Sequence, residues 1–306
     1  MTVEKHPGYR RAFGGEGMTV GVGFPLSDAE ESPPPVDEEL RLAQHAEELG
    51  YDALWARDVP LYWPKFGDRG QSYEPWPWLG HMAAHTEHIA LGTASVVLPL
   101  RHPLHVATSA ATVDRLSDGR LLMGIATGDR DPEFAAFDVD RADRGALFRE
   151  SVETLRTVWK GEFPETTFER GELSGELDPI PKPEYGTIPL LPTGNARQTV
   201  EWIGEHGDGW LFYHLPDETL ESYLEEWRVA AGEKPYAMAV RTELADDPTA
   251  APEPRHQGYR AGIEWFREYF QKLQTLGVDH VLAGPSCDDG PQAALTRFAE
   301  GVVDEL

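Results

Sequence analysis

The sequence predicts an α/β fold, a (β/α)8 TIM barrel in which parallel strands alternate with helices. Three observations predict it. The chain has 306 residues, a length typical of one such barrel. Eight short apolar runs alternate with eight segments of helical periodicity, which is the pattern of a parallel sheet. The strand–helix–strand repeat at 89–126 is complete enough to be followed residue by residue. We therefore expect a single barrel domain over residues 1–306.

The expected elements follow one another along the whole chain. The strands are expected at 19–24, 52–56, 89–98, 121–126, 188–192, 209–213, 236–240 and 280–283. The helices are expected at 37–49, 76–88, 103–116, 145–159, 196–206, 217–231, 263–276 and 291–303.

The segment 89–126 has the clearest start and stop signals. Pro103 suits the first turn of a helix, and Val106, Ala110 and Val113 then recur at helical spacing. The dipeptide Asp118-Gly119 favours the left-handed conformation in which many helices end. Apolar strands on both sides complete a βαβ unit, which builds parallel sheets.

A doubly wound open sheet is the alternative architecture. It would need a phosphate-binding turn after the first strand, of the form G-x-G-x-x-G. Residues 21–28 read GVGFPLSD and lack the later glycine. Eight repeats also favour a closed barrel over an open sheet.

Three connections are too long to be simple turns, so we expect insertions after strand 2 (59–75), helix 4 (162–187) and strand 7 (241–262). The βα loops of a barrel surround its active site, and the first and third insertions follow strands. The first is rich in aromatic residues, which favours a substrate pocket: Tyr62, Trp63, Phe66 and Tyr73.

Charge restricts the possible partners. The chain has 53 acidic residues against 27 basic ones, a net charge of −26. Such a field repels nucleic acid and anionic membranes, so neither is expected as a partner. The composition resembles that of proteins from salt-loving organisms, since only six of the basic residues are Lys. A mildly acidic enzyme from an ordinary organism is the alternative.

Cysteine and hydropathy indicate the compartment. Cys287 is the only cysteine, which excludes an internal disulfide and a cysteine-built metal site. No apolar run is long enough to cross a bilayer, and residues 1–18 lack the apolar core of a secretory signal. We expect a cytoplasmic protein.

Small and polar residues lie where the third, fourth and fifth expected strands end. Residues 92–95 are Gly-Thr-Ala-Ser, whose small side chains let a flat ring approach the backbone, or simply pack beneath a helix. Thr127, Gly128 and Arg130 offer hydrogen bonds to a phosphate or a polyol. Residues 193–198 turn into a helix whose N–H groups favour an anion, and Asn195 is expected to cap that helix.

A family resemblance adds to these observations. GTASVVLP, RHP, LSDGR, GIATGD and EFAAF, all within 89–159, resemble the bacterial-luciferase-like flavin-dependent oxidoreductases. LPTGNARQTVEWIGEHGDGW at 191–210 extends the resemblance. It implies FMN, or alternatively the deazaflavin F420, lying across the C-terminal mouth of the barrel. It also implies a small organic substrate. Members of the family are commonly homodimers, and some receive their reduced cofactor from a separate flavin reductase.

The resemblance implies roles for particular residues. A non-proline cis peptide behind the flavin ring would fall at Ala94-Ser95, and Arg144 would contact the phosphate. Bacterial luciferase has an Arg where this chain has Thr127, and Arg130 is the expected substitute. The implied cofactor-binding residues are Thr93, Ala94, Ser95, Thr127, Gly128, Asp129, Arg130, Arg144, Gly194, Asn195, Ala196 and Gln198.

The end of the second strand is the expected place for catalytic residues. Bacterial luciferase has a catalytic histidine close to this position, where this chain has Asp58 or Val59. Asp58 is expected to accept a proton or hold the substrate, with Arg57 as its partner. A structural Arg57–Asp58 contact at the rim is the alternative.

Two further clusters of polar residues could bind an ion. His81, His85 and His88 share one helix face but lack a placed carboxylate, so surface histidines are favoured over a metal site. The group 255–260, with two Arg and one His, lies after strand 7, where barrels often bind phosphate. It is either an anion site or a set of ion pairs with Glu253 and its neighbours.

Other functional classes remain open. Motifs for triad hydrolysis, nucleotide phosphates and zinc proteases are missing. A barrel hydrolase or isomerase that uses Asp58 with a loop carboxylate stays possible, as does a barrel that binds flavin without catalysis. Monooxygenation with reduced FMN and O2 is the preferred activity, and F420-dependent hydride transfer is the alternative.

Overall fold

Eight parallel strands form a closed barrel in a computed structural model that describes residues 3–15, 17–26, 32–66 and 72–306. Hydrogen-bonded neighbours run in the order β12-β1-β2-β3-β4-β7, and β9 pairs with both β12 and β8. A single bridge between Thr193 and Leu211 joins β7 to β8 and completes the ring. The barrel strands are β1 (Thr19–Phe24), β2 (Ala53–Ala56), β3 (Ala90–Val97), β4 (Leu121–Ala126), β7 (Leu190–Pro192), β8 (Trp210–Phe212), β9 (Tyr236–Leu244) and β12 (His280–Ser286).

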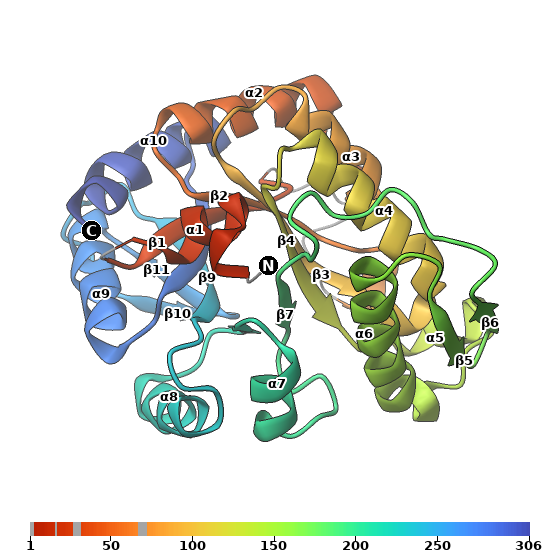
Figure 1. Ribbon diagram of the computed structural model, residues 1–306. Coiled ribbons are helices and arrows are strands. Elements are labelled where there is room, and N and C mark those ends of the chain that lie inside the picture. The colour runs from red at the N-terminus through yellow and green to blue at the C-terminus, as the bar shows by residue number, and fades with distance from the viewer. Residues whose placement is uncertain (1–2, 16, 27–31, 67–71) are drawn as a thin grey trace.

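The helices lie around the outside of the barrel, as Figure 1 shows. Most begin at a proline or a polar cap, and each turns an apolar stripe toward the strands. The surrounding helices are α2 (Val36–Glu48), α3 (Pro75–Ala83), α4 (Pro103–Leu116), α6 (Arg144–Lys160), α7 (Val200–His206), α8 (Asp217–Ala231), α9 (Ile263–Leu276) and α10 (Pro291–Gly301). This architecture confirms the predicted α/β barrel.

The barrel interior is packed with few large side chains. Trp55 points inward and fills the space left by glycines on neighbouring strands, since a Cβ at Gly92 would lie 2.3 Å from its ring. The indole of Trp55 donates to Nε2 of His280 at 3.0 Å, and the hydroxyl of Thr19 contacts the other ring nitrogen of His280 at 2.7 Å. Complete burial lowers the pKa of His280 to about 3, so this histidine is a neutral core residue.

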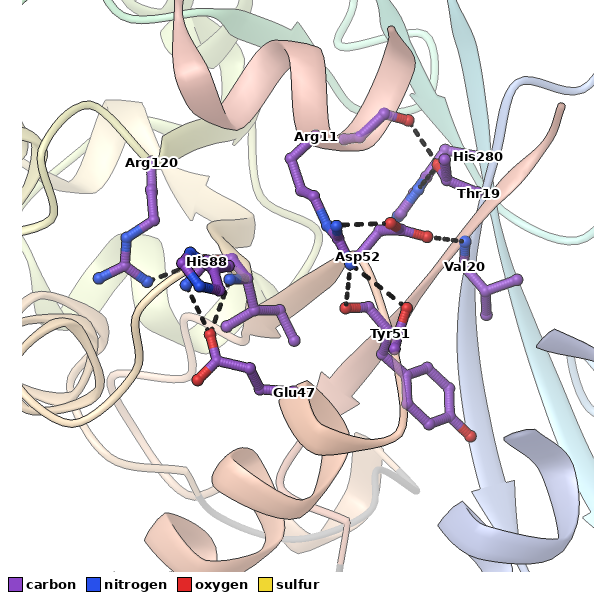
Figure 2. Close-up of polar contacts among 12 residues, drawn as sticks. Arg11, Thr19, Val20, Glu47, Tyr51, Asp52, His88, Arg120 and His280 are labelled. Atoms are coloured by element: carbon purple, nitrogen blue, oxygen red, sulfur yellow. Dashed lines mark hydrogen bonds and ion pairs between the residues drawn. The ribbon is translucent and has the colours of Figure 1, made fainter. Parts of the chain in front are cut away.

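A short helix that the sequence did not indicate, α1 (Pro7–Phe13), covers the N-terminal end of the barrel (Figure 1). Its Ala12 packs into the barrel interior together with Trp55. Arg11 then forms an ion pair with Asp52 at 3.0 Å, and Asp52 accepts from the backbone N–H of Val20, as Figure 2 shows. The helix therefore closes the end of the barrel opposite to the expected site.

Glu47 organises the same face (Figure 2). Its carboxylate accepts the backbone N–H groups of Glu87, His88 and Ile89 at 2.7–3.2 Å. Partial burial opposes ionisation, but these three bonds and the charge of Arg120 outweigh it and lower the pKa of Glu47. This carboxylate fixes the chain just before β3 begins.

Some predicted boundaries were wrong. Strand β9 continues to Leu244, four residues beyond the predicted end, and the helix predicted from 196 begins at Val200. Helix α3 stops at Ala83, short of the predicted 88. The prediction also missed helix α5 (Asp131–Ala136) and the hairpin strands β5 (Glu165–Phe168), β6 (Gly171–Ser174), β10 (Glu253–Arg255) and β11 (Gly258–Ala261).

The long connections contain these missed elements. The connection after α6 holds the β5–β6 hairpin, and the connection after β9 holds β10 and β11. Of the aromatic loop after β2, residues 67–71 lie outside the described part of the chain. None of the helices in the described ranges has the length and apolar character needed to cross a bilayer.

Candidate active site

The ends of β3 and β7 are joined across the strand between them. The hydroxyl groups of Ser95 and Thr193 form a hydrogen bond, although β4 lies between these two strands. Gly124 of β4 makes this possible, because a Cβ there would lie 3.0 Å from the Ser95 hydroxyl and 2.1 Å from the carbonyl oxygen of Thr93. The hydroxyl of Thr93 donates to the carbonyl of Gly124 at 2.8 Å. Three strand ends thus meet at one place with small side chains.

The backbone of β3 changes conformation at this point. The peptide bond between Ala94 and Ser95 is cis, as the resemblance implied. The pairing of β3 with β4 also shifts register between Thr93 and Val96. Both irregularities lie at the C-terminal end of the strand, on the mouth side of the barrel.

The end of β4 supplies a tight glycine turn. Gly128 has a φ of +81°, and a Cβ there would lie 2.8 Å from Val97 and 3.1 Å from Phe134. A larger residue would therefore be strained and crowded at this position. Thr127 beside it is buried, whereas Asp129 is exposed.

Arg130 is held by the loop that follows β2. Its guanidinium lies over the ring of Phe66 at 4.6 Å and 4.0 Å from the carboxylate of Glu133. Burial is the main effect that lowers the pKa of Arg130, and Arg57 adds to it. The expected cationic substitute for the luciferase arginine is thus buried at the mouth and stacked on an aromatic ring.

The turn after β7 is not the helix start that the sequence predicted. Gly194, Ala196 and Arg197 all have positive φ, at +57°, +43° and +56°. Helix α7 begins later, and its cap is Thr199, which accepts from the N–H of Trp202 at 3.3 Å. The prediction that Asn195 caps this helix was therefore wrong.

The same turn is firmly attached to the barrel. The N–H of Gly194 donates to the carbonyl of Leu211 at 2.8 Å, and the Trp210 indole donates to the carbonyl of Gly194 at 2.7 Å. The Gln198 amide donates to the carbonyl of Gly145 at 2.9 Å, which ties the turn to the start of α6. The left-handed residues are thus fixed against α6, with Asn195 exposed.

Arg144 is a buried cation at the start of α6, next to the turn after β7. It is 9% exposed, donates to the carbonyl of Arg141 at 2.6 Å, and its buried Nε atom has no hydrogen-bond partner. Burial, followed by the charges of Arg141 and Arg197, lowers the pKa of Arg144, with Asp131 acting in the opposite direction. Arg141 is paired with Asp131 at 2.7 Å, whereas Arg144 has no carboxylate partner among the described residues, in a protein that is strongly acidic overall.

One of the two residues predicted to be catalytic is held in an ion pair. Both follow directly after β2, which ends at Ala56. The Arg101 guanidinium donates to both carboxylate oxygens of Asp58 at 2.7 and 3.0 Å. The N–H of Val97 is a further donor to Asp58 at 3.0 Å. The structure does not bring Asp58 into the mouth.

Arg101 connects Asp58 to the aromatic loop. It also donates to Glu74 at 2.8 Å, so one guanidinium holds two carboxylates beside a cavity of about 360 Å3. His102 next to it accepts from the N–H of Leu104 at 3.3 Å, which makes it the cap of α4. Burial lowers the pKa of Arg57.

Sequence reasoning missed Tyr213 at the end of β8. Its ring would lie 3.1 Å from a Cβ at Gly194. Partial burial, followed by the charge of Asp129, raises the pKa of Tyr213. An aromatic residue one position after a short strand was the available signal, because it continues the inward alternation of Leu211.

The three histidines predicted on one helix face do not all lie on a helix, because α3 ends at Ala83. His81 is on α3 and His85 lies just beyond its end, with their rings 4.5 Å apart. Across the described ranges, no group of three or more His, Cys, Asp or Glu side chains is placed to hold a metal ion. His85 and His88 are exposed, as a surface role requires, whereas His81 is half-buried and its buried Nε2 has no hydrogen-bond partner.

The residues at the mouth fit a cofactor that has a flat ring and an anionic group. The unpaired Nε of Arg144, flanked by Arg141 and Arg197, lacks an anionic partner. The side chains at the end of β3 are small, and the glycine turn after β4 packs closely against Val97 and Phe134, so no bulky side chain projects from these two segments. A barrel with these features at its C-terminal end defines a class of cofactor-binding (β/α)8 enzymes.

Comparison with known proteins identifies the family. The family model for luciferase-like monooxygenases matches residues 18–298, and the chain belongs to this family. An F420-dependent hydroxymycolic acid dehydrogenase of Mycobacterium tuberculosis is 31% identical over 244 residues. That match covers 76% of this chain and 65% of the relative, just under two thirds of its length.

Two further similarities agree with this assignment. The oxygenase component of a flavin-dependent trigonelline monooxygenase from Acinetobacter baylyi is 30% identical over 273 residues, covering 82% of this chain and 72% of that one. The crystal structure of a monooxygenase from Streptomyces bottropensis superposes with a TM-score of 0.77 over 94% of this chain and 99% of that one. At 23% identity, the latter shows a shared fold.

Proposed function

We propose that this chain is a flavin-dependent oxidoreductase, a luciferase-like monooxygenase that uses reduced FMN and O2 on a small organic substrate. One observation carries the proposal. Arg144 is buried beside a left-handed turn, near Arg141 and Arg197, with a guanidinium nitrogen that has no hydrogen-bond partner. Arg141 is paired with Asp131, but Arg144 has no such carboxylate among the described residues, and a phosphorylated cofactor would supply the missing anion.

The residues divide into three groups around the proposed cofactor. Thr93, Ala94 and Ser95 would face the ring through their small side chains. Thr127, Gly128, Asp129 and Arg130 would line the side chain that connects ring and phosphate. Arg144 would hold the phosphate, together with the turn formed by Gly194, Asn195, Ala196 and Gln198.

The protein's own part in the reaction is positioning. When bound, the reduced cofactor supplies the electrons with which one atom of O2 enters the substrate and the other leaves as water. Arg57, which follows the end of β2, is proposed to contact the substrate. Asp58 is proposed to act indirectly, because it fixes Arg101 and through it the aromatic loop after β2.

F420-dependent hydride transfer is the second candidate. The relative from Mycobacterium tuberculosis is named for F420, and a phosphate site of the same kind serves either cofactor. A barrel that binds flavin without catalysis is a third possibility. A hydrolase based on Asp58 and a loop carboxylate has less support, since Arg101 holds both Asp58 and Glu74.

An activity assay distinguishes these candidates. We expect a panel of small organic substrates to be oxygenated when reduced FMN is supplied in air, with product retaining label from 18O2. F420-dependent transfer would instead bleach the 420 nm absorbance without O2 and leave no label in the product. Binding of either cofactor without turnover on any substrate would favour the non-catalytic barrel.

The remaining expectations are also proposals. We propose that residues 1–306 act as one domain, that the protein is a cytoplasmic homodimer, and that a separate flavin reductase supplies its reduced cofactor. The trigonelline monooxygenase relative is described as an oxygenase component, which supports the last point. The net charge of −26 supports adaptation to high salt, because salt screens the self-repulsion of the folded chain.

A further inference from the structure

One wall of the barrel rises above the others. Strand β9 is longer than its neighbours, and after Val240 its free edge pairs with β11, which in turn pairs with β10. On the other edge, β12 follows β9 up to Ser286. The result is a four-stranded extension in the order β12, β9, β11 and β10, beside the mouth.

The register of this extension places residues in two rows. In one row Glu243 of β9 lies between Ser286 of β12 and Arg260 of β11. Arg260 in turn lies opposite Glu253 of β10. In the next row Arg241 of β9 lies between Gly284 of β12 and Gly258 of β11. Gly258 in turn lies opposite Arg255 of β10. Side chains two residues apart on a strand share a face, so both rows belong to the same face.

That face is continuous with the barrel interior. Ala237 of β9 and Leu282 of β12 pack in the interior cluster, whereas Tyr236, Met238, Val240 and Leu244 pack against the helices. Alternation therefore directs Arg241 and Glu243 to the mouth side. We call the group of Arg241, Glu243, Arg255 and Arg260 the arginine wall.

A single carboxylate is shared among three guanidinium groups in the arginine wall. Glu243 lies 3.2 Å from Arg260, 3.3 Å from Arg255 and 3.9 Å from Arg241, measured between oxygen and nitrogen atoms. Arg255 has a second carboxylate, Glu253, at 2.9 Å. Three positive charges thus face two negative ones, and the buried Nε of Arg241 has no hydrogen-bond partner.

The arginine wall is accessible from outside. Gly284 and Gly258 lie opposite Arg241 in its row, and the strands pack closely there, since a Cβ at Gly258 would lie 2.0 Å from the carbonyl oxygen of Arg241. The four charged side chains are 26–36% exposed, which leaves their outer surface accessible. His256, which the sequence grouped with these arginines, is exposed in the turn between β10 and β11 and contributes nothing to the wall.

We propose that the arginine wall binds the oxyanion of an organic substrate, a carboxylate or a phosphate. The inference rests on the proposed function, because it assumes that the reacting part of the substrate lies over a cofactor in the mouth. Loops after the seventh and eighth strands are a recurrent place for anions in barrels, and β9 and β12 are these strands here. Glu243 keeps the three guanidinium groups oriented and leaves a net charge for the ligand.

Thermal unfolding at constant ionic strength tests the proposal, with benzoate, inorganic phosphate and neutral benzamide as probes. We expect benzoate or phosphate to raise the unfolding midpoint saturably, and benzamide to have no such effect. The double variant Arg241→Gln/Arg255→Gln should bind the effective anion at least tenfold more weakly. The control is Arg10→Gln, on α1 at the opposite end of the barrel. It also removes a positive charge, and it should bind the anion as tightly as wild type does.

Glu243→Gln gives a result of opposite sign, and it remains informative if the double variant does not fold. Removing the competing carboxylate should tighten anion binding several-fold. The proposal is overturned if wild type shows no saturable response to either anion, or if all variants respond alike. The probe that binds more tightly distinguishes a carboxylate substrate from a phosphorylated one.

Titration with FMN and with F420 separates this proposal from the proposed function. The double variant should bind the cofactor as wild type does, since the arginine wall is distinct from the Arg144 cluster. Loss of cofactor binding in the double variant would assign the wall to the cofactor and overturn the substrate site. Failure of wild type to bind either cofactor would overturn the proposed function, whatever the anion probes show.

Discussion

Ser95 and Thr193 are hydrogen-bonded to each other over the backbone of a strand that separates them. The bond is possible because the intervening residue, Gly124, has no side chain. It joins the small-residue end of β3 to the left-handed turn after β7, two segments 98 positions apart in sequence. These are the segments on which the proposed cofactor would rest.

Removing either hydroxyl should therefore weaken the same link. We expect Ser95→Ala and Thr193→Val each to lower the free energy of unfolding by about 1 kcal/mol. The double variant should lose clearly less than the sum of the two, because the bond can be lost only once. Urea unfolding of the four proteins measures the coupling energy, and strict additivity would show that the hydroxyls do not depend on each other.

Arg144→Gln should weaken cofactor binding while the fold stays intact. A charge-assisted hydrogen bond contributes about 1.5–3 kcal/mol, which corresponds to roughly 10–150-fold in affinity. Arg115→Gln is the matched control, since Arg115 forms an exposed ion pair with Glu184 near the end of α4. Equal affinities of the two variants for FMN and F420, followed by fluorescence, would contradict a phosphate site at Arg144.

Asp58→Asn tests whether this residue supports the rim or acts on the substrate. Its side chain is 1% exposed and accepts from both Arg101 and Val97, so loss of the charge leaves Arg101 with one carboxylate, Glu74. We expect a loss of about 3 kcal/mol in stability, as for other broken buried pairs.

Arg101→Gln serves as the comparison for Asp58→Asn. The two variants should be destabilised alike, and the double variant little further, when stability is measured by chemical unfolding. A catalytic role for Asp58 would show itself differently. Asp58→Asn would then keep nearly full stability and lose turnover, and Arg101→Gln would not reproduce the effect.

Glu39 should make stability depend on pH. Glu39 is 3% exposed and accepts a hydrogen bond from the Trp78 indole at 2.6 Å. Burial raises the pKa of Glu39 to about 7, although the hydrogen bond acts in the opposite direction. Between its unfolded value of about 4.5 and pH 7 the folded state binds the extra proton, so stability falls as pH rises through this window.

Glu39→Gln removes that dependence. Between pH 5 and pH 8, the free energy of unfolding of the variant should rise relative to that of wild type by on the order of 2–3 kcal/mol. Urea unfolding of both proteins at the two pH values gives the difference, in which the many other carboxylates cancel. A stability difference that is the same at both pH values would show that Glu39 does not titrate in this range.

The barrel was accessible from sequence where the local signals agreed. Helix α4 begins at Pro103 and ends before Asp118-Gly119 as predicted, because start, apolar spacing and stop all point the same way. The Ala94–Ser95 cis peptide was accessible only through the family resemblance. Composition and periodicity carry no signal for it.

Other features were not accessible for physical reasons. Asn195 and Thr199 are both good helix caps, and nothing local says that two left-handed residues, Ala196 and Arg197, lie between them. The contact between Asp58 and Arg101 spans 43 positions and depends on tertiary packing. Strand β9 was predicted to be too short because its continuation carries charged residues on the face toward the mouth, which looks like a loop in sequence.

The central claim is that the ends of β3, β4 and β7 form one site for a flavin-type cofactor. Fluorescence titration of the wild-type protein with FMN and, separately, with F420 tests it most directly. We predict saturable binding of at least one of the two with one site per chain and a dissociation constant in the micromolar range or below, about −8 kcal/mol. No saturable binding of either cofactor up to about 1 mM, where the binding free energy is only about −4 kcal/mol, would contradict the account.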